Sequence, residues 1–175
     1  DIKDFMNAPP AGFDSPVFQI LMTLVGLEKP LVAAVQGAAI GIGTTALLHC
    51  DLVYAREDAK LHMPFVNLGL CPEGASSVLL PRLAGMQKAT ELLMFGEPFS
   101  AAVAERVGLV NEIFPASSFD SDVMNRVQRL AAKPAASLRA TKQLLRGQYR
   151  EEVKETMLRE GAAFLERLGS PEATE

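Results

Sequence analysis

The sequence has no tryptophan, only two cysteines and only two histidines among its 175 residues. Cys50 and Cys71 stand in apolar surroundings without a partner at metal-ligand spacing, so we expect reduced, buried, structural thiols rather than a disulfide or a nucleophile. His49 and His62 also lack companions at such spacing, and we expect both to be structural. The sequence therefore predicts no metal site and favours a reducing compartment inside the cell.

An excess of positive charge is missing as well. The formal net charge is −4 and the pI is about 5.3, which argues against nucleic acid as the main partner. No apolar run is long enough to cross a bilayer, and no signal peptide is visible, so we expect no membrane partner. A hydrophobic content of 49% with 22% charged residues is instead typical of a soluble globular protein with one good core.

The hydrophobic pattern predicts an α/β core over residues 1–114 and a helical region over residues 115–175. Apolar residues recur at helical spacing between Phe18 and Leu27, and the continuous run Leu31–Val35 is typical of a strand buried on both faces. Further strands are expected over 51–55, 60–63 and 109–114, and further helices over 44–49, 76–83, 86–95, 101–107, 119–130, 134–146 and 149–168.

Glu73 is the candidate catalytic residue, in the segment from Met63 to Ser77. It stands between Pro72 and Gly74, with apolar residues before it and small residues after it. A carboxylate in such surroundings can be desolvated, which raises its pKa toward the working pH and suits it to proton transfer. The alternative interpretation is a surface turn, because Pro-Glu-Gly is also ordinary turn chemistry.

A glycine-rich segment, Gln36 to Thr45, precedes this carboxylate and is a candidate oxyanion binder. Gly37, Gly41 and Gly43 let the chain turn tightly from a strand end into a helix start, where free backbone N–H groups can bind negative charge. The spacing is not that of a dinucleotide-binding fingerprint. A proton carrier together with an oxyanion binder suggests chemistry next to a carbonyl group.

The serines near Glu73 are not expected to act as nucleophiles. No Gly-x-Ser-x-Gly motif surrounds Ser76 or Ser77, and we expect both to help start the helix that follows them. Ser100 is expected to cap the helix that begins at Ala101.

Five segments, in order, resemble the enoyl-CoA hydratase/isomerase (crotonase) family and together extend over nearly the whole chain. They are Lys29–Gly41, Cys50–Ala55, Asn67–Leu70, Gly96–Ala101 and Gly108–Asn111. The resemblance implies a crotonase-type ββα spiral core with a C-terminal α-helical oligomerisation region, and homotrimers or hexamers. It also implies an acyl-CoA thioester substrate, with no cofactor besides the coenzyme A that the substrate carries.

The resemblance assigns roles to residues at the start of the chain and in the glycine-rich segment. It makes the backbone amide of Ile42, next to Gly41, one of two oxyanion donors, and it puts the second donor before Asp1. It also implies that Asp1, Ile2 and Lys3 belong to the loop whose backbone contacts the adenine end of coenzyme A. We therefore expect the chain to be a piece of a longer subunit.

Basic residues of the C-terminal region have two possible roles. By the same resemblance, Lys133, Arg139, Lys142 and Arg146 include candidates for contacts with coenzyme A phosphates. As charges on solvated helix faces, they would instead need no ligand.

The departures from the family pattern favour one reaction. Hydratases of this family use two glutamates, whose positions are occupied here by Thr45 and Phe65, whereas Glu73 stands where Δ3,Δ2-enoyl-CoA isomerases carry their base. The resemblance thus implies an isomerase of fatty acid β-oxidation that moves a 3-enoyl-CoA double bond to the 2-trans position by a 1,3-proton transfer. Phe65 and Leu70 are expected to form a dry wall that receives the acyl chain.

Two alternatives remain at this point. One is a non-catalytic acyl-CoA-binding module, and the other is a different enolate reaction of the crotonase type, catalysed by a hydratase, hydrolase or dehalogenase. The expected location is cytoplasmic for a bacterial protein and peroxisomal or mitochondrial for a eukaryotic one.

Overall fold

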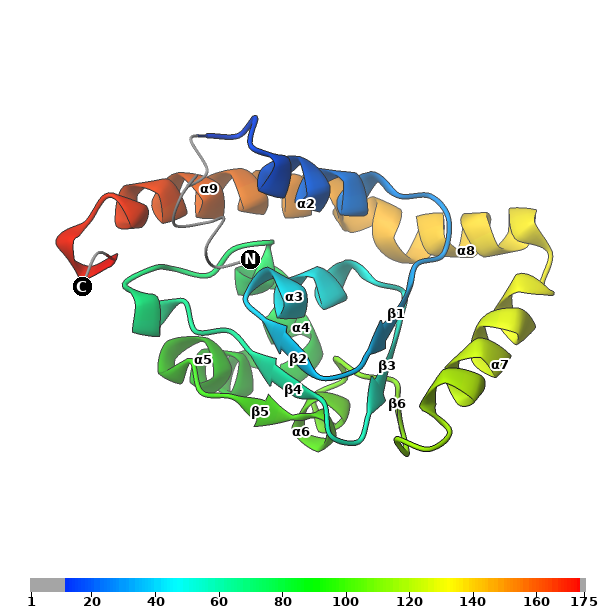
Figure 1. Cartoon of the computed structure of the whole chain (residues 1–175). Helices are drawn as coiled ribbons and strands as arrows, with labels where there is room; N and C mark the ends of the chain where they lie inside the picture. The colour runs from blue at the N-terminus through cyan, green and yellow to red at the C-terminus, as the bar shows by residue number, and fades with distance from the viewer. Residues whose placement is uncertain (1–11, 174–175) are drawn as a thin grey trace.

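Two small sheets form the centre of the computed structural model, which describes residues 12–173 (Figure 1). In the first sheet the strands β1 (Val32–Val35), β3 (Leu52–Arg56) and β6 (Glu112–Phe114) are parallel and follow the order β1-β3-β6. In the second sheet β4 (Lys60–His62) pairs in parallel with β2 (Ala38–Ile40) and antiparallel with β5 (Phe99–Ser100).

The strands differ from the sequence-based expectation in two ways. The run over residues 31–35 does form β1, but the prediction that it is buried on both faces is wrong, because Ala34 is exposed and β1 pairs in the described residues with β3 alone. The strands β2 and β5 were not predicted. Strand β2 lies inside the glycine-rich segment, which was expected to turn into a helix, and β5 has only two residues, too few for a hydrophobic period to appear.

The predicted helices are present, with ends that differ by a few residues. They are α2 (Pro16–Gly26), α3 (Ile42–Thr45), α4 (Ser76–Ala84), α5 (Met86–Phe95), α6 (Ala101–Arg106), α7 (Phe119–Ala131), α8 (Ala135–Arg146) and α9 (Arg150–Leu168). The predicted helix over 44–49 is α3 continued by the 3-10 turn Ala46–His49, and further 3-10 turns cover Val66–Leu68, Gly147–Tyr149 and Pro171–Ala173. Between residues 12 and 173 no helix has both the length and the apolar character of a membrane span.

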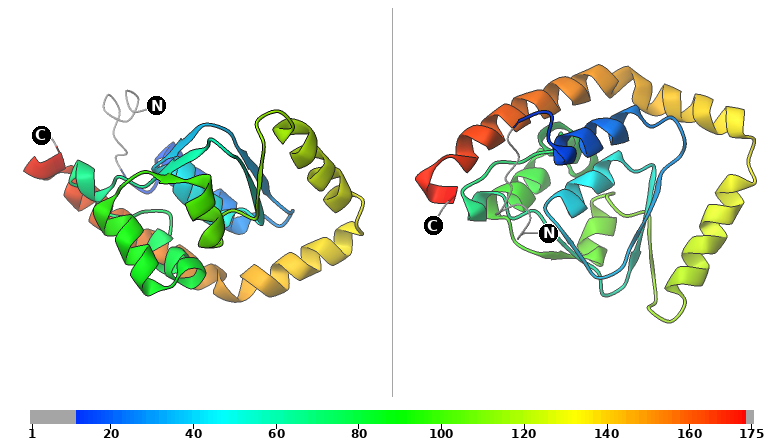
Figure 2. Two further views of the ribbon diagram at one scale, coloured as in Figure 1. Left: turned by 90° about the horizontal axis from the view of Figure 1, so that it is seen from below. Right: turned by 45° about the horizontal axis from the view of Figure 1, so that its top comes forward.

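The C-terminal helices curve around the outside of the core. In Figures 1 and 2, α7 stands beside the first sheet, α8 continues from it, and α9 runs along α2. Tyr54 and Phe114 of the first sheet pack against Phe119 and Val123 of α7. Helix α9 contacts both α2 and α4, so the end of the chain returns to the segment that carries Glu73.

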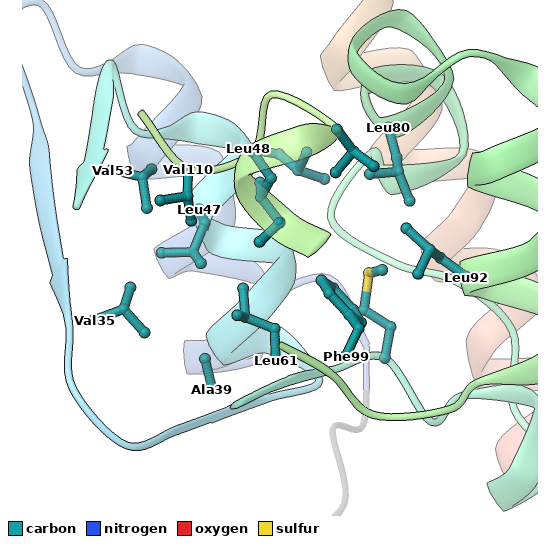
Figure 3. Packing of buried hydrophobic residues seen from close by; sticks show 14 of the residues in the cluster. Val35, Ala39, Leu47, Leu48, Val53, Leu61, Leu80, Leu92, Phe99 and Val110 are labelled. Carbon is teal, nitrogen blue, oxygen red and sulfur yellow. The ribbon is translucent and has the colours of Figure 1, made fainter. Parts of the chain in front are cut away.

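The main hydrophobic core lies between the two sheets and the helices α4 to α6. Figure 3 shows part of it, with side chains from both sheets and from the turn after α3, among them Val35, Leu47, Leu48, Val53, Leu61, Leu80, Leu92, Phe99 and Val110. A second cluster joins Leu21 of α2 and Ala75 to Val153 and Met157 of α9. This second cluster holds α9 against the start of α4.

Several large apolar side chains are left at the surface, on α5 and α8 in particular: Met86, Met94, Phe95, Leu144 and Leu145. Such faces are compatible with the predicted homotrimer or hexamer, which remains a prediction. The predicted division between residues 114 and 115 also remains a prediction.

Asp51 fastens α8 to the core. Its carboxylate accepts hydrogen bonds from Lys142 Nζ at 2.7 Å and from the Leu31 backbone N–H at 2.7 Å, and it lies 2.9 Å from Arg146 Nε. The Arg146 guanidinium also donates to the carbonyl oxygens of Leu48 and Cys50. Lys142 and Arg146, two candidates for coenzyme A phosphates, thus already have partners within the fold.

We expect Asp51→Asn to lower the free energy of unfolding by about 2 kcal/mol, because a neutral amide is a weaker partner for the half-buried Lys142 ammonium. Urea unfolding followed by circular dichroism measures the change. Asp58→Asn is the matched control, since Asp58 pairs with Arg56 at the surface, and its urea midpoint should match that of the unaltered protein. Equal midpoints for both variants would contradict the role of Asp51.

Candidate active site

The turn that carries Glu73 lies inside the protein, contrary to the surface-turn interpretation. Gly74 and Ala75 both have positive φ values, 68° and 57°, and Gly74, Ala75 and Ser76 are buried. A Cβ atom at Gly74 would lie only 3.3 Å from both Cβ and Oγ1 of Thr45. A glycine therefore meets two needs there, a left-handed backbone and close approach to α3.

Two hydrogen bonds hold the turn that carries Glu73 in place. The buried His49 ring makes one through Nε2 to the Gly74 carbonyl oxygen, at 2.7 Å, and the Ser76 hydroxyl donates to the Glu73 carbonyl oxygen at 2.6 Å. His62 contacts the carbonyl oxygen of Gly96 in the same way. Both histidines thus make structural contacts, as the sequence suggested.

The Glu73 carboxyl group meets the Thr45 hydroxyl, which donates a hydrogen bond to Glu73 Oε1. Although Glu73 keeps some exposed surface, burial of its carboxyl group raises its pKa to about 7. The Thr45 hydrogen bond acts in the opposite direction, and the negative charge of Glu160 adds to the rise. Near neutral pH, Glu73 therefore populates both its acidic and its basic form, which suits a group that takes up and returns a proton.

Helix α3 brings Ile42 and Thr45 to the same place. Ile42 is its first residue, so the Ile42 N–H has no partner within the helix. Thr45 stands three residues later, on the same side of a helical turn. The Ile42 side chain packs in the cluster that contains Ala75, directly after the Glu73 turn. The predicted oxyanion donor and the predicted base therefore belong to contacting segments.

Hydrogen bonds to the second sheet fix the position of α3. The Gly41 N–H donates to the His62 carbonyl oxygen at 2.8 Å, and the fully buried Thr44 hydroxyl donates to the Ala39 carbonyl oxygen at 2.6 Å. Gly41 has a φ of 55°, which turns the chain from β2 into the helix.

Phe65 and Leu70, the residues expected to form a wall of the acyl site, both belong to the main core or pack against it. Phe65 is buried in the main core, and Leu70 packs against that core, with its N–H donating to the Phe65 carbonyl oxygen at 2.8 Å. No hydrogen bond or hydrophobic cluster among the described residues joins either side chain to Glu73, so their role as a wall of the acyl site remains a prediction. Asp1, Ile2 and Lys3 lie outside the described residues.

An open hollow of about 380 Å³ lies beside the Glu73 turn, between that turn and α9. Its lining consists of Cys71, Pro72, Ser77, Thr156, Arg159, Glu160 and Ala163.

The Cys71 and Cys50 thiols are free and half-buried rather than fully buried. Burial raises the pKa of both thiols, so they stay protonated at neutral pH. In the described part of the chain, no group of three potential metal-ligating side chains gathers.

No pattern in the sequence pointed to Glu160, a second carboxylate close to the turn. It is 8% exposed, and its two oxygens accept hydrogen bonds from the Ala75 N–H at 2.5 Å and the Ser77 N–H at 2.9 Å. Ser76 and Ser77 are the first two residues of α4, as expected, but the N-cap residue is Ala75, and the backbone N–H groups at the helix start are satisfied by Glu160, 85 residues away from Ala75. Ser100, in contrast, does cap α6.

Comparison with known proteins agrees with this geometry. The family model described as enoyl-CoA hydratase/isomerase matches residues 1–174. Human enoyl-CoA delta isomerase 2 is 39% identical over 160 residues, which are 87% of this chain and 41% of that protein. The human chromodomain Y-like protein is 35% identical over 138 residues, which are 79% of this chain and 23% of that protein.

A solved structure extends the match to three dimensions. The enoyl-CoA hydratase/isomerase from Pseudoalteromonas atlantica superposes with a TM-score of 0.94 at 38% identity, over 100% of this chain and 70% of that one. The chain thus has the crotonase fold but spans less than half the length of the two curated relatives. From the family match over nearly every residue and the shared fold, we conclude that the chain belongs to the enoyl-CoA hydratase/isomerase family, close to its enoyl-CoA isomerases.

Proposed function

We propose that this protein is a Δ3,Δ2-enoyl-CoA isomerase, which moves the double bond of a 3-enoyl-CoA to the 2-trans position in fatty acid β-oxidation. One observation carries the proposal: the Glu73 carboxyl group, with a pKa near 7, accepts a hydrogen bond from Thr45 of the helix that begins at the Ile42 amide. The likeness to enoyl-CoA delta isomerases adds support.

The first step is removal of a proton from C2 of the substrate. The ionised Glu73 carboxylate takes this proton, and the electron pair of the broken C–H bond spreads over the thioester carbonyl and the adjacent double bond. The product is a dienolate with negative charge on the thioester oxygen. The Ile42 N–H donates a hydrogen bond to this oxygen, since backbone amides at such a position stabilise developing oxyanions.

The second step returns the proton. The Glu73 carboxylic acid protonates C4, and the remaining electrons form the C2–C3 double bond, so the thioester becomes conjugated and Glu73 is ionised again. One carboxylate is enough because the proton leaves and returns on the same face. Addition of water would instead need a second acid or base, and the two family positions for such groups carry Thr45 and Phe65.

The hollow between the Glu73 turn and α9, of about 380 Å³, is in the volume range of small-molecule sites. Glu73, Thr45 and Ile42 are not among its lining residues, and Arg159 and Glu160 are, so we do not assign the acyl chain to it. In this proposal Asp1, Ile2 and Lys3, which lie outside the described residues, contact the adenine end of coenzyme A, and exposed apolar faces on α5 and α8 contact neighbouring subunits of a homotrimer or hexamer.

Replacing Glu73 tests the central assignment. In the complete protein, Glu73→Gln should lower kcat for 3-hexenoyl-CoA about 100- to 10,000-fold, because no other carboxylate carries the proton. The absorbance of the conjugated 2-enoyl thioester measures turnover, and calorimetry measures substrate binding, which should persist. Glu105→Gln, an exposed change on α6, is the control and should keep full turnover.

Other results of this assay favour other functions. Full turnover by Glu73→Gln would contradict the role of Glu73. Binding of 3-hexenoyl-CoA without conversion by the unaltered protein would favour an acyl-CoA-binding module. Release of free coenzyme A, or of halide from a halogenated acyl-CoA, would favour a hydrolase or a dehalogenase.

The pH profile tests the state of the carboxyl group. Because Glu73 must be ionised to take the first proton, kcat/KM should rise with pH and reach half its maximum near pH 7. Thr45→Val removes the hydrogen bond that favours the ionised form, so its half-maximum should move to higher pH by about one unit.

The matched control for this profile is Thr23→Val. The Thr23 hydroxyl bonds only the preceding turn of α2 among the described residues, so its profile should coincide with that of the unaltered protein. A Thr45→Val profile that coincides with the control, or moves to lower pH, would show that the hydroxyl does not stabilise the Glu73 carboxylate.

A further inference from the structure

Besides burial, the negative charge of Glu160, on α9, raises the pKa of the Glu73 carboxyl group. Its own carboxylate is buried, and its oxygens accept from the N–H groups of Ala75 and Ser77. These N–H groups belong to the start of α4, which follows Glu73 within three residues. Glu160 therefore binds the backbone that carries the proposed base.

The charge of Glu160 works against the positive end of α4. The N-terminus of a helix carries free N–H groups and partial positive charge, which stabilise a nearby carboxylate. Without a partner, the start of this nine-residue helix would favour the ionised form of Glu73 and make it a weaker base. Glu160 occupies two of these N–H groups and adds its own negative charge, so both effects keep Glu73 more basic.

The surroundings leave Glu160 little scope to transfer protons itself. Both of its oxygens are already engaged by backbone N–H groups. Burial raises the pKa of Glu160, whereas the positive charge of Arg159, the preceding residue on α9, favours the ionised form and acts to lower that pKa. The Arg159 guanidinium donates to the Thr156 hydroxyl at 3.0 Å. Facing it from the Glu73 turn is the Cys71 thiol, which is protonated and points to the Glu160 backbone carbonyl. On the far side of Glu73, α3 contributes the uncharged Thr45, and His49 contacts Gly74.

We propose that Glu160 is a positioning residue for the proton transfer, which holds the start of α4 from α9 and keeps Glu73 a strong enough base. The inference rests on the proposed isomerase function and deepens it. It also makes α9 part of the active site, because Val153 and Met157 of the same helix pack against Leu21 and Ala75. The packing of α9 against α2 and the start of α4 then affects how basic the Glu73 carboxylate is.

The test compares pH profiles of kcat/KM for 3-hexenoyl-CoA in the complete protein. Glu160→Gln keeps the length of the side chain but removes the charge, and its amide can accept from only one of the two N–H groups. We expect its half-maximum to move to lower pH by about half a unit to one unit. Above both pKa values, kcat should fall about threefold, because the weaker base removes the proton more slowly.

Two further variants separate this effect from mere loss of stability. Glu160→Asp keeps the charge but shortens the side chain by one methylene, which takes the carboxylate farther from the start of α4. We therefore expect the pH of half-maximal kcat/KM to move in the same direction as in Glu160→Gln, but by less. Glu155→Gln makes the same change of charge at an exposed position of α9 and should leave the profile in place. If Glu160→Gln does not fold, the Asp variant decides the question.

The inference would be overturned if kcat/KM of Glu160→Gln reached half its maximum at the same pH as that of Glu155→Gln, or at a higher pH. This holds even if the Glu160→Gln variant unfolds at a lower temperature than the unaltered protein. A purely structural cap lowers kcat equally at every pH and leaves the profile where it is.

Failure of the proposed function can be told apart from failure of this inference. If the unaltered protein does not isomerise 3-enoyl-CoA, the function is wrong, and the Glu73 carboxyl group is then titrated directly by carbon-13 NMR of glutamate-labelled protein. The signal absent from Glu73→Gln identifies it. A lower pKa for this signal in Glu160→Gln supports the influence of Glu160, and an unchanged or higher pKa refutes it.

Discussion

The structure depends on the balance between burial of the Glu73 carboxyl group and one hydrogen bond from Thr45. Burial favours the neutral acid, whereas the hydroxyl favours the carboxylate, and the result is a pKa near 7. Stronger burial would leave an acid that cannot accept a proton, and full solvation would leave a base too weak to remove one from carbon. The remaining features of the site maintain this balance.

Three elements far apart in sequence meet at this group. Helix α3 supplies Thr45 and the Ile42 amide, the left-handed pair Gly74 and Ala75 turns the chain into α4, and α9 returns at the end to bind the start of α4. The contact from α3 is made by the short Thr45 side chain, whereas the contact from α9 needs the long Glu160 side chain, which loses rotamer freedom when it is fixed.

Membership of the enoyl-CoA hydratase/isomerase family defines the scaffold more closely than the reaction. The relatives include an enoyl-CoA delta isomerase and a chromodomain Y-like protein at similar identity. A common fold can therefore support different functions, and the reaction has to be argued from the site. In this chain, Glu73 with no acid or base at the positions of Thr45 and Phe65 suits a reaction in which one carboxylate takes up a proton and returns it.

The sequence by itself determined most helices and four of the six described strands, because these depend on local patterns, and its family motifs were enough to propose Glu73 and Ile42 as site residues. Only the tertiary structure revealed the Thr45 hydrogen bond, the burial of Phe65 in the main core and the capping of α4 by Glu160. The partners Thr45 and Glu73 are 28 residues apart, and Ala75 and Glu160 are 85 apart. Contacts over such separations leave no period or motif in the sequence, since they depend on how whole helices pack.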